Sequence, residues 1–368
     1  MSGVISTSAP YSVAEYLNGG APVAAAEATR ARMQTLTEQV ASGLISNTYA
    51  GLGAGASVSL SLSPVLARQQ TWQNNVNAAS GPMQVTQTVL TQISSIAANF
   101  VAQSNDLNNV TPSQIDTVAA SARAALGQVA SLLDSTDGGN YVFAGTDSAN
   151  PPVPGPDSIL SSGFYTQIQA AVAALGTAGA PATIAATLAT ASSNAAGTSP
   201  FSTALSQPAA VVNTTLPQVQ VGDDTFVTSG IAASANASVA STGSSTTGSY
   251  MRDILRGLAT IGSMSSSQAS VAGFTTLVVD TQSSLSGAVT ALNQDAGVLG
   301  NTQSQLTQTQ TLLTQTSTAL QGQVSSAQDV DMAQTISAIT QTQTQLQASY
   351  QLIANLQSLT LTKYLPAA

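Results

Sequence analysis

Residues 278–324 decide the fold, and they read VVDTQSSLSGAVTALNQDAGVLGNTQSQLTQTQTLLTQTSTALQGQV. Within this stretch an apolar residue recurs at every seventh position without a miss: Val278, Leu285, Leu292, Leu299, Leu306, Leu313 and Leu320. A seven-residue repeat holds an apolar stripe on one helix face, which is typical of helices packed side by side. The positions four residues later are partly polar, because Gln303, Gln310 and Ser317 are among them. We therefore predict a helical bundle rather than an isolated leucine zipper, with the leucines of the repeat in its core.

The apolar repeat loses its register at the end of this stretch. Gly322 and residues 325–330 interrupt it, and a new phase begins at Met332. The second phase continues through Ile336, Ile339, Leu346, Tyr350, Ile353 and Leu356. Two helical segments that are out of phase predict two structural layers with a joint between them.

The first part of the chain supplies partner helices. One is expected after Pro22, since proline is tolerated in a first helical turn, and its apolar face comprises Met33, Leu36, Val40 and Leu44. Two further helices are expected over residues 64–101 and from Thr111-Pro112 to residue 133. A DGGN turn at 137–140 then precedes the β-prone run Tyr141-Val142-Phe143.

Residues 146–250 lie between the two helical parts and are rich in Pro, Gly, Ser, Thr and Ala, which predicts irregular or β-containing structure. Short helices are expected at 164–175 and 181–191, and a hairpin over 219–227 that turns at Gly222-Asp223. The low-complexity stretch 234–248 is expected to be a loop.

Together these patterns predict a mainly α protein with a small α+β insertion. Its N- and C-terminal segments form a long antiparallel helical bundle or coiled coil, and its middle domain is irregular and contains β-structure. The predicted parts are a terminal coiled-coil domain (1–45 and 325–368), a helical bundle domain (46–145 and 251–324) and a variable middle domain (146–250).

The composition excludes much chemistry. Charged residues are only 6% of the 368 residues, there is no histidine or cysteine, and Lys363 is the only lysine. Triads that need histidine, thiol nucleophiles and the usual zinc sites are thereby excluded. A net charge of −9 with seven basic residues leaves no basic stripe for nucleic acid or an anionic membrane. We expect no catalytic residue, cofactor or metal, and neither nucleic acid nor membrane as a partner.

The chain shows neither an apolar run long enough to span a bilayer nor the basic and apolar regions of a cleaved signal peptide. If the protein is secreted, we expect an export route without a cleaved signal.

Three local motifs have ordinary structural explanations. The glycines of YAGLGAGAS (Gly51, Gly53 and Gly55) are spaced GxGxG with no preceding strand, so a corner between helices is favoured over a phosphate loop. Asp329 and Asp331 are favoured as helix caps over cation ligands. Asp223 and Asp224 fit a turn better than a catalytic pair. The sequons at Asn109, Asn213 and Asn236 carry little weight in a chain rich in Ser and Thr.

The terminal helices are the candidate functional surface. No charged residue occurs from Met332 to Thr362, a span with its own apolar stripe and many Gln and Thr. Either this span is a core helix of a compact bundle, or it is an interface helix that packs against other subunits. Gln, Thr and Ser allow close packing without the desolvation cost of ions, and a surface without charge favours self-association.

Four stretches resemble the flagellin superfamily, most closely its hook–filament junction proteins (hook-associated protein 3). They are ISTSAPYS (5–12), TEQVASGLISNTYAGLGAGAS (37–57), DGGNYVFAGTDS (137–148) and DVDMAQTISAITQTQTQLQASYQLIANLQSLTLTKYL (329–365), the last being the most specific. The chain departs from the family pattern at NTYAG (47–51), where many relatives carry an acidic turn. The middle of the chain has no matching motif.

The resemblance implies an extracellular structural subunit of the bacterial flagellum, exported unfolded by the flagellar type III route. Its terminal helices would form the inner tube of an axial filament, the flanking helices the next layer, and the middle domain would project outward. Implied partners are copies of itself, hook-associated protein 1, flagellin and a flagellar export chaperone. Terminal regions in this family order on assembly, so we expect residues 332–361 to be mobile in the monomer.

Other functions remain open at this point. Flagellin itself shares the architecture, and a tip protein of a type III secretion needle would also pair long helices from both chain ends. An enzyme in the middle domain is disfavoured, because Tyr165 is the only ionisable side chain between Asp157 and Asp223.

Overall fold

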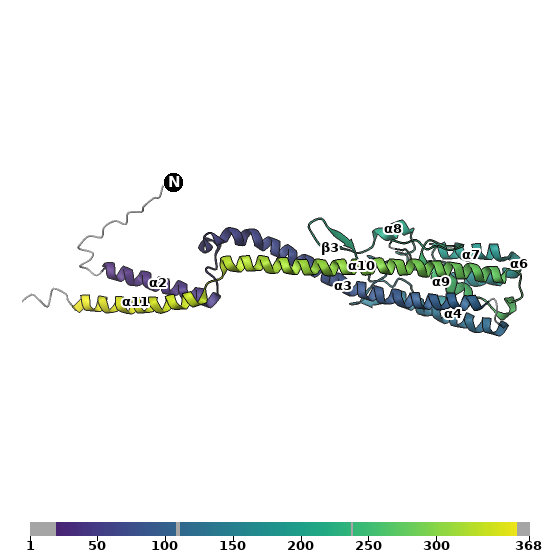
Figure 1. Cartoon of the computed structure of the whole chain (residues 1–368), viewed down its shortest axis with the longest axis horizontal. Coiled ribbons are helices and arrows are strands. Elements are labelled where there is room, and N and C mark those ends of the chain that lie inside the picture. The colour runs from purple at the N-terminus through teal and green to yellow at the C-terminus, as the bar shows by residue number, and fades with distance from the viewer. Residues whose placement is uncertain (1–19, 108–110, 237, 359–368) are drawn as a thin grey trace, which may run out of the picture. The chain divides into compact units, whose positions relative to one another are not determined.

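The computed structural model describes residues 20–107, 111–236 and 238–358 (Figure 1). It is mainly helical and contains two small two-stranded sheets, which confirms the predicted fold class. The chain divides into two compact units. We call residues 1–68 and 316–368 the terminal unit and residues 69–315 the central unit.

The terminal unit is built from both chain ends. It contains α2 (Gly20–Ser42), the short 3-10 helix η1 (Tyr49–Leu52), the start of α3 (Gly55–Asp106), the end of α10 (Phe274–Gln328) and α11 (Met332–Ser358). Helices α2 and α11 lie side by side and run in opposite directions (Figure 1). The predicted antiparallel pairing of the chain ends is thus confirmed.

Backbone hydrogen bonds tie the two chain ends together at the joint between α10 and α11. The amide of Ile45 donates to the carbonyl of Gln328 at 2.7 Å, and the amide of Val330 donates to the carbonyl of Gly43 at 2.9 Å. The side chain of Gln39 donates to the carbonyl of Ile45 at 2.8 Å. The chain leaving α2 and the chain entering α11 are therefore fixed to one another.

The centre of the central unit is a buried helix, α9 (Tyr250–Gly262). Every residue of α9 is buried. Helices α4, α5 and α7 contact it. Most of α3 and of α10 also belongs to this unit. The remaining elements are α4 (Pro112–Leu133), β1 (Thr136–Asp137), β2 (Asn140–Tyr141), η2 (Pro156–Ser161), α5 (Gly163–Ala173), α6 (Leu175–Ala178), α7 (Ala180–Ser192), α8 (Ala209–Thr214), β3 (Gln218–Gln220), β4 (Phe226–Thr228) and η3 (Ser266–Gln268).

Both sheets are antiparallel hairpins. Thr136 pairs with Tyr141 in the first, around the DGGN turn, and Val219 pairs with Val227 in the second. The second hairpin lies where the sequence predicts it, with Asp223 and Asp224 between its strands. Helix α4 begins as predicted, because Thr111 and Gln114 form a capping box with Pro112 in the first turn.

The apolar repeat that decides the fold lies along α10. Leu285, Leu292, Leu299, Leu306 and Leu313 are buried, and Leu320 is half-buried. Hydrogen bonds link the polar flanks of α10 and α3, as between Ser94 Oγ and Asn293 Oδ1 at 2.8 Å. Four glutamines on α3 and α10 each have a buried side-chain amide atom without a hydrogen-bond partner among the described residues: Gln69, Gln87, Gln303 and Gln310.

The helices extend further than the sequence predicts. Helix α10 continues through Gly322 and ends at Gln328, so the expected interruption at this glycine is wrong. One glycine costs a helix only about 1 kcal/mol relative to alanine, which a long helix absorbs. Helix α3 begins at Gly55 rather than at residue 64.

Candidate functional site

The residues predicted for the assembly interface lie on α2, on α11 and at the joint, and they differ in exposure. Seven are half-buried: Met33, Leu36, Val40, Leu44, Ile339, Leu346 and Ile353. Three are exposed on α11, namely Met332 at 41%, Ile336 at 52% and Tyr350 at 51%. Leu356 belongs to α11, but its side chain is outside the described residues. Large apolar side chains of α11 are thus left open to solvent beside α2.

Threonines fill part of the contact between α2 and α11. Thr335 and Thr342 are buried at 5% and 3% exposure. Their hydroxyls donate to the carbonyls of Asp331 and Ala338, one turn earlier in the same helix. Because the hydroxyl is satisfied internally, a threonine here offers its methyl group to a neighbour without the cost of an unpaired polar atom.

Threonine hydroxyls on the exposed side of α11 also donate to main-chain carbonyls of the same helix. The hydroxyls of Thr340 and Thr344 donate to the carbonyls of Ile336 and Thr340. Residues 332–358 carry no formal charge. Desolvating this helix therefore removes neither an ion nor many free hydroxyls from water, and its surface is suited to close packing against another apolar or amide-rich surface.

The joint explains Asp331 and the glycine-rich corner. Asp329 does not cap α11: it directly follows α10 and forms an isolated β-bridge with Leu44. Oδ1 of Asp331 accepts from the amides of Ala333 and Gln334, each at 3.0 Å, which confirms that Asp331 caps α11. Gly53 has a positive φ of 56°, which favours glycine. A Cβ atom on Gly55 would lie 2.5 Å from the carbonyl oxygen of Ala327. The corner is therefore a close approach of α3 to the end of α10.

The buried helix α9 carries a polar core that the sequence did not reveal. Arg252, Asp253 and Arg256 are at most 7% exposed. Arg256 Nη2 forms an ion pair with Asp280 Oδ2 at 3.3 Å and donates to Ser284 Oγ at 3.0 Å. Burial lowers the pKa of Arg256, and Asp280 opposes that effect.

Buried carboxylates fix the low-complexity loop 234–248 onto this core. Asp253 accepts from the amide and hydroxyl of Thr247, both at 2.9 Å. Asp280 accepts from Ser245 Oγ at 2.6 Å. Asp295 accepts from the amide of Ser238 at 3.0 Å and from the Tyr250 hydroxyl at 2.9 Å. These carboxylates accept hydrogen bonds from hydroxyls and main-chain amides of the loop, and so they hold the loop against the core around α9.

The remaining motifs occupy ordinary positions. Asp223 and Asp224 lie in the β3–β4 turn, where Gln220 donates to the Asp223 carbonyl at 3.1 Å. Asn213 is exposed on α8, and Asn236 is half-buried with its amide donating to two carbonyls. The sequon at Asn109 lies outside the described residues.

Two family models match the chain. Residues 23–148 match the bacterial flagellin N-terminal helical region, and residues 283–365 match the bacterial flagellin C-terminal helical region. No curated protein matches the chain. Among the described residues, no helix has both the length and the apolar character needed to cross a membrane.

Proposed function

The chain belongs to the flagellin superfamily, and from this premise we propose that it forms the junction between the hook and the filament. As a member of this family it is a structural subunit of the extracellular bacterial flagellum and not an enzyme. The proposal has two parts, an assembly surface and a position in the appendage.

We propose that α11, supported by α2, is the assembly surface. The observation that carries this is the exposure of Met332, Ile336 and Tyr350 on a helix without formal charge. Fully burying one such side chain contributes about 1.5–3 kcal/mol. Ordering one residue costs about 1–2 kcal/mol of backbone entropy. A helix pair that leaves these side chains half open is marginal alone and gains stability against copies of itself or close relatives.

A truncation tests the assembly surface directly. A chain ending before Asp329 lacks α11 but keeps the central unit. We expect it to fail to join flagellar structures when it is added to purified hooks or filament fragments, while circular dichroism still shows a folded helical protein. Incorporation of this truncated chain at the level of the full chain would refute the assignment.

The junction position is supported by the DGGNYVFAGTDS stretch (137–148), which resembles junction proteins, and by Tyr350 in α11. The ending SLTLTKYL (358–365) supports it as well, although residues 359–365 lie outside the described part. In this position the partners are copies of the chain, hook-associated protein 1, flagellin and an export chaperone. The inner-tube, bundle and outward-projecting domains stay as predicted from the sequence: 1–45 with 325–368, 46–145 with 251–324, and 146–250.

Electron microscopy distinguishes the junction role from the filament role. Purified protein is mixed with short filament seeds and viewed in negative stain. A junction protein adds a short cap and stops, and flagellin then extends from it. A filament subunit grows long filaments from the seeds by itself, and that result would assign the chain as flagellin.

A further inference from the structure

Phe226 is the exception among the six phenylalanines of the chain. It is 57% exposed, whereas each of the others is at most 5% exposed. It lies on β4 opposite Gln220 of β3, and it shares the solvent-facing side of the hairpin with Gln218 and Thr228. Figure 1 shows this hairpin standing away from the long helices of the central unit. A single exposed apolar side chain is ordinary, but a cleft lies directly beside this one.

The cleft has a volume of about 700 Å³ and lies between the β1–β2 hairpin, the β3–β4 hairpin and α3, all within the central unit. Phe226 is one of its lining residues. Asp137 is the only lining residue with a formal charge. The apolar part of the lining includes Ala78, Ala79, Pro82, Val142 and Val219.

The two hairpins that form the walls of the cleft are both fixed to α3. Asn75 Nδ2 donates to the carbonyl of Gln220 at 3.1 Å, which ties the β3–β4 hairpin to the helix. At the β1–β2 turn, a Cβ atom on Gly81 would lie 2.9 Å from Asp137 Oδ2, so this turn packs closely on α3. The cleft is therefore formed before any partner binds, and binding to a preformed site costs little conformational entropy.

A second copy of the chain is the partner that fits both features. The family to which the chain belongs builds the flagellum from assembling subunits. An exposed aromatic side chain and a partly apolar cleft on one molecule are complementary surfaces, and such unlike surfaces link identical copies into rings or rows. The strands of the β3–β4 hairpin carry no formal charge, which favours self-association. This hairpin lies outside both matched regions, so the family match does not account for it.

We propose that Phe226 of one copy packs into the cleft of a neighbouring copy. This inference rests on the proposed function, because it needs copies that assemble next to one another. Helix α11 holds each copy in the appendage, and the Phe226 contact joins the central units of neighbouring copies. The contact is thus a second interface, built from a part of the chain that is separate from α11.

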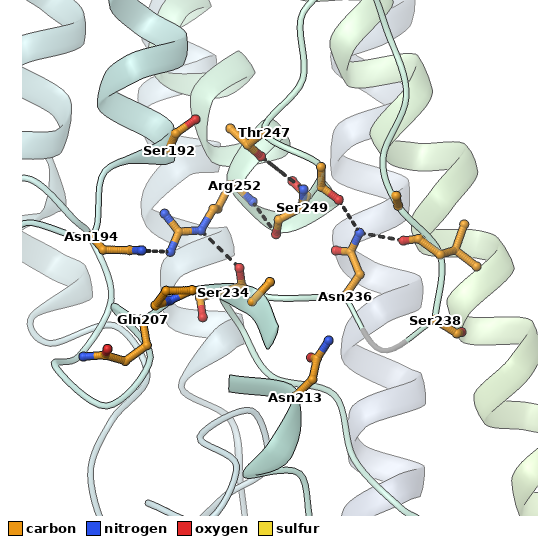
Figure 2. Close-up of a pocket in the computed structure, with 15 residues that line it drawn as sticks. Ser192, Asn194, Gln207, Asn213, Ser234, Asn236, Ser238, Thr247, Ser249 and Arg252 are labelled. Atoms are coloured by element: carbon orange, nitrogen blue, oxygen red, sulfur yellow. Dashed lines mark hydrogen bonds between the residues drawn. The ribbon is translucent and has the colours of Figure 1, made fainter. Parts of the chain in front are cut away.

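The polar pocket of about 370 Å³ beside the N-terminus of α9 provides a comparison (Figure 2). Arg252 in its wall donates to main-chain carbonyls and to Oδ1 of Asn194. None of the large apolar side chains that are exposed in the described part of the chain lines this pocket. Gln207 is exposed and lines it, and is therefore a control position for Phe226.

Photo-crosslinking on the full chain tests the contact. Phe226 is replaced by p-benzoylphenylalanine, which keeps an aromatic ring at this position. The protein is mixed with an equal amount of isotope-labelled parent chain, assembled on filament seeds and irradiated. We expect cross-linked peptides that join position 226 of the unlabelled chain to residues 75–86 or 137–148 of the labelled chain. The same replacement at Gln207 is expected to give no cross-link between copies.

Cross-links from position 226 that stay within one chain, or that reach only the flagellin of the seeds, would overturn the proposal. Incorporation is scored separately by sedimentation. A parent chain that does not sediment with the seeds refutes the assembly surface on α11 and with it this contact. A chain that sediments without cross-links between copies refutes the contact at Phe226 alone.

Two alanine variants measure the contribution of the side chain. Phe226→Ala is expected to raise the protein concentration at which half of the seed ends are occupied about fivefold. Its melting temperature should stay unchanged, because the side chain is exposed in the monomer. Gln207→Ala should occupy the seeds as the parent does. Equal occupancy by the two variants would overturn the proposed role of Phe226.

Discussion

Truncating Ile336 to alanine separates assembly from folding, because this side chain is 52% exposed on α11. Full burial of an isoleucine contributes about 1.5–3 kcal/mol, so the half that is still exposed leaves about 1 kcal/mol to be gained on assembly. Since 1.4 kcal/mol is a factor of ten, Ile336→Ala is expected to raise the protein concentration at which half of the seed ends are occupied about fivefold. The monomer loses little, because alanine is the better helix former.

Tyr350, exposed to 51% on the same helix, allows a test of additivity. It lies fourteen residues from Ile336, or about 21 Å along a helix, and substitutions that far apart add. The double alanine variant is therefore expected to raise the protein concentration at which half of the seed ends are occupied about thirtyfold.

The assay is sedimentation of the protein with filament seeds over a range of concentrations, together with urea unfolding of the monomer. Val211→Ala is the matched control, because Val211 is 49% exposed on α8, outside both matched family regions. If Ile336→Ala and Val211→Ala shift the concentration at which half of the seed ends are occupied equally, α11 is not the assembly surface. A large loss of monomer stability in Ile336→Ala would contradict the exposed position of this side chain in the structure.

Three further predictions concern stability. Leu292→Ala, at a fully buried position of the α10 repeat, is expected to lower the free energy of unfolding by about 2–5 kcal/mol, measured with urea, and Leu320→Ala by less because Leu320 is half-buried. Asp331→Ala removes the cap of α11 and is expected to lower the free energy of unfolding by about 1 kcal/mol. Circular dichroism should show reduced helicity and earlier melting of the terminal unit. Asp331→Asn keeps a side-chain acceptor and should keep most of the stability. Burial and the nearby Asp295 carboxylate raise the pKa of Tyr250 well above its ordinary value of 10.0. Above about pH 10 the native state therefore retains a proton that the unfolded chain loses, and the urea midpoint should fall as the pH rises. Tyr250→Phe should show a shallower fall, and an equal fall in both proteins would contradict the raised pKa of Tyr250.

Much of the helical framework is predictable from the sequence, because its apolar period is long and regular. The repeat from Leu285 to Leu313 places one buried side chain on every second turn of α10, so local periodicity and tertiary burial agree. The cap at Asp331 is likewise local, since a carboxylate and the amides two and three residues later suffice to form it. Such features need no information from distant parts of the chain.

The sequence places α9 within the predicted helical bundle domain, but it does not predict that the helix is completely buried. Arg252, Asp253 and Arg256 within one turn indicate a solvent-facing helix, yet all are buried. Their partners are main-chain carbonyls and hydroxyls from segments such as 191–194 and 245–247, and sequence patterns do not reveal which carbonyls come together. The polar pocket was missed for the same reason.

The sequence predicts an apolar face on α11, but it does not predict which residues of that face are exposed. The apolar stripe of α11 identifies Ile336, Ile339 and Tyr350 as one face, but it does not say which of them α2 covers. In the structure the contact with α2 is shared with Thr335 and Thr342, whose hydroxyls bond within α11. A hydropathy pattern counts threonine as polar and so shifts the predicted face.

The absence of formal charge on α11 has a consequence for the water in which the appendage works. Dissolved salt weakens exposed contacts between ions, with a screening length of about 10 Å at 0.1 M. Methyl groups, amides and apolar side chains are not screened in this way. If α11 is the assembly surface, as proposed above, attachment of the subunit should depend little on salt concentration. A cell that moves between fresh water and brine should then keep its flagellum attached in both.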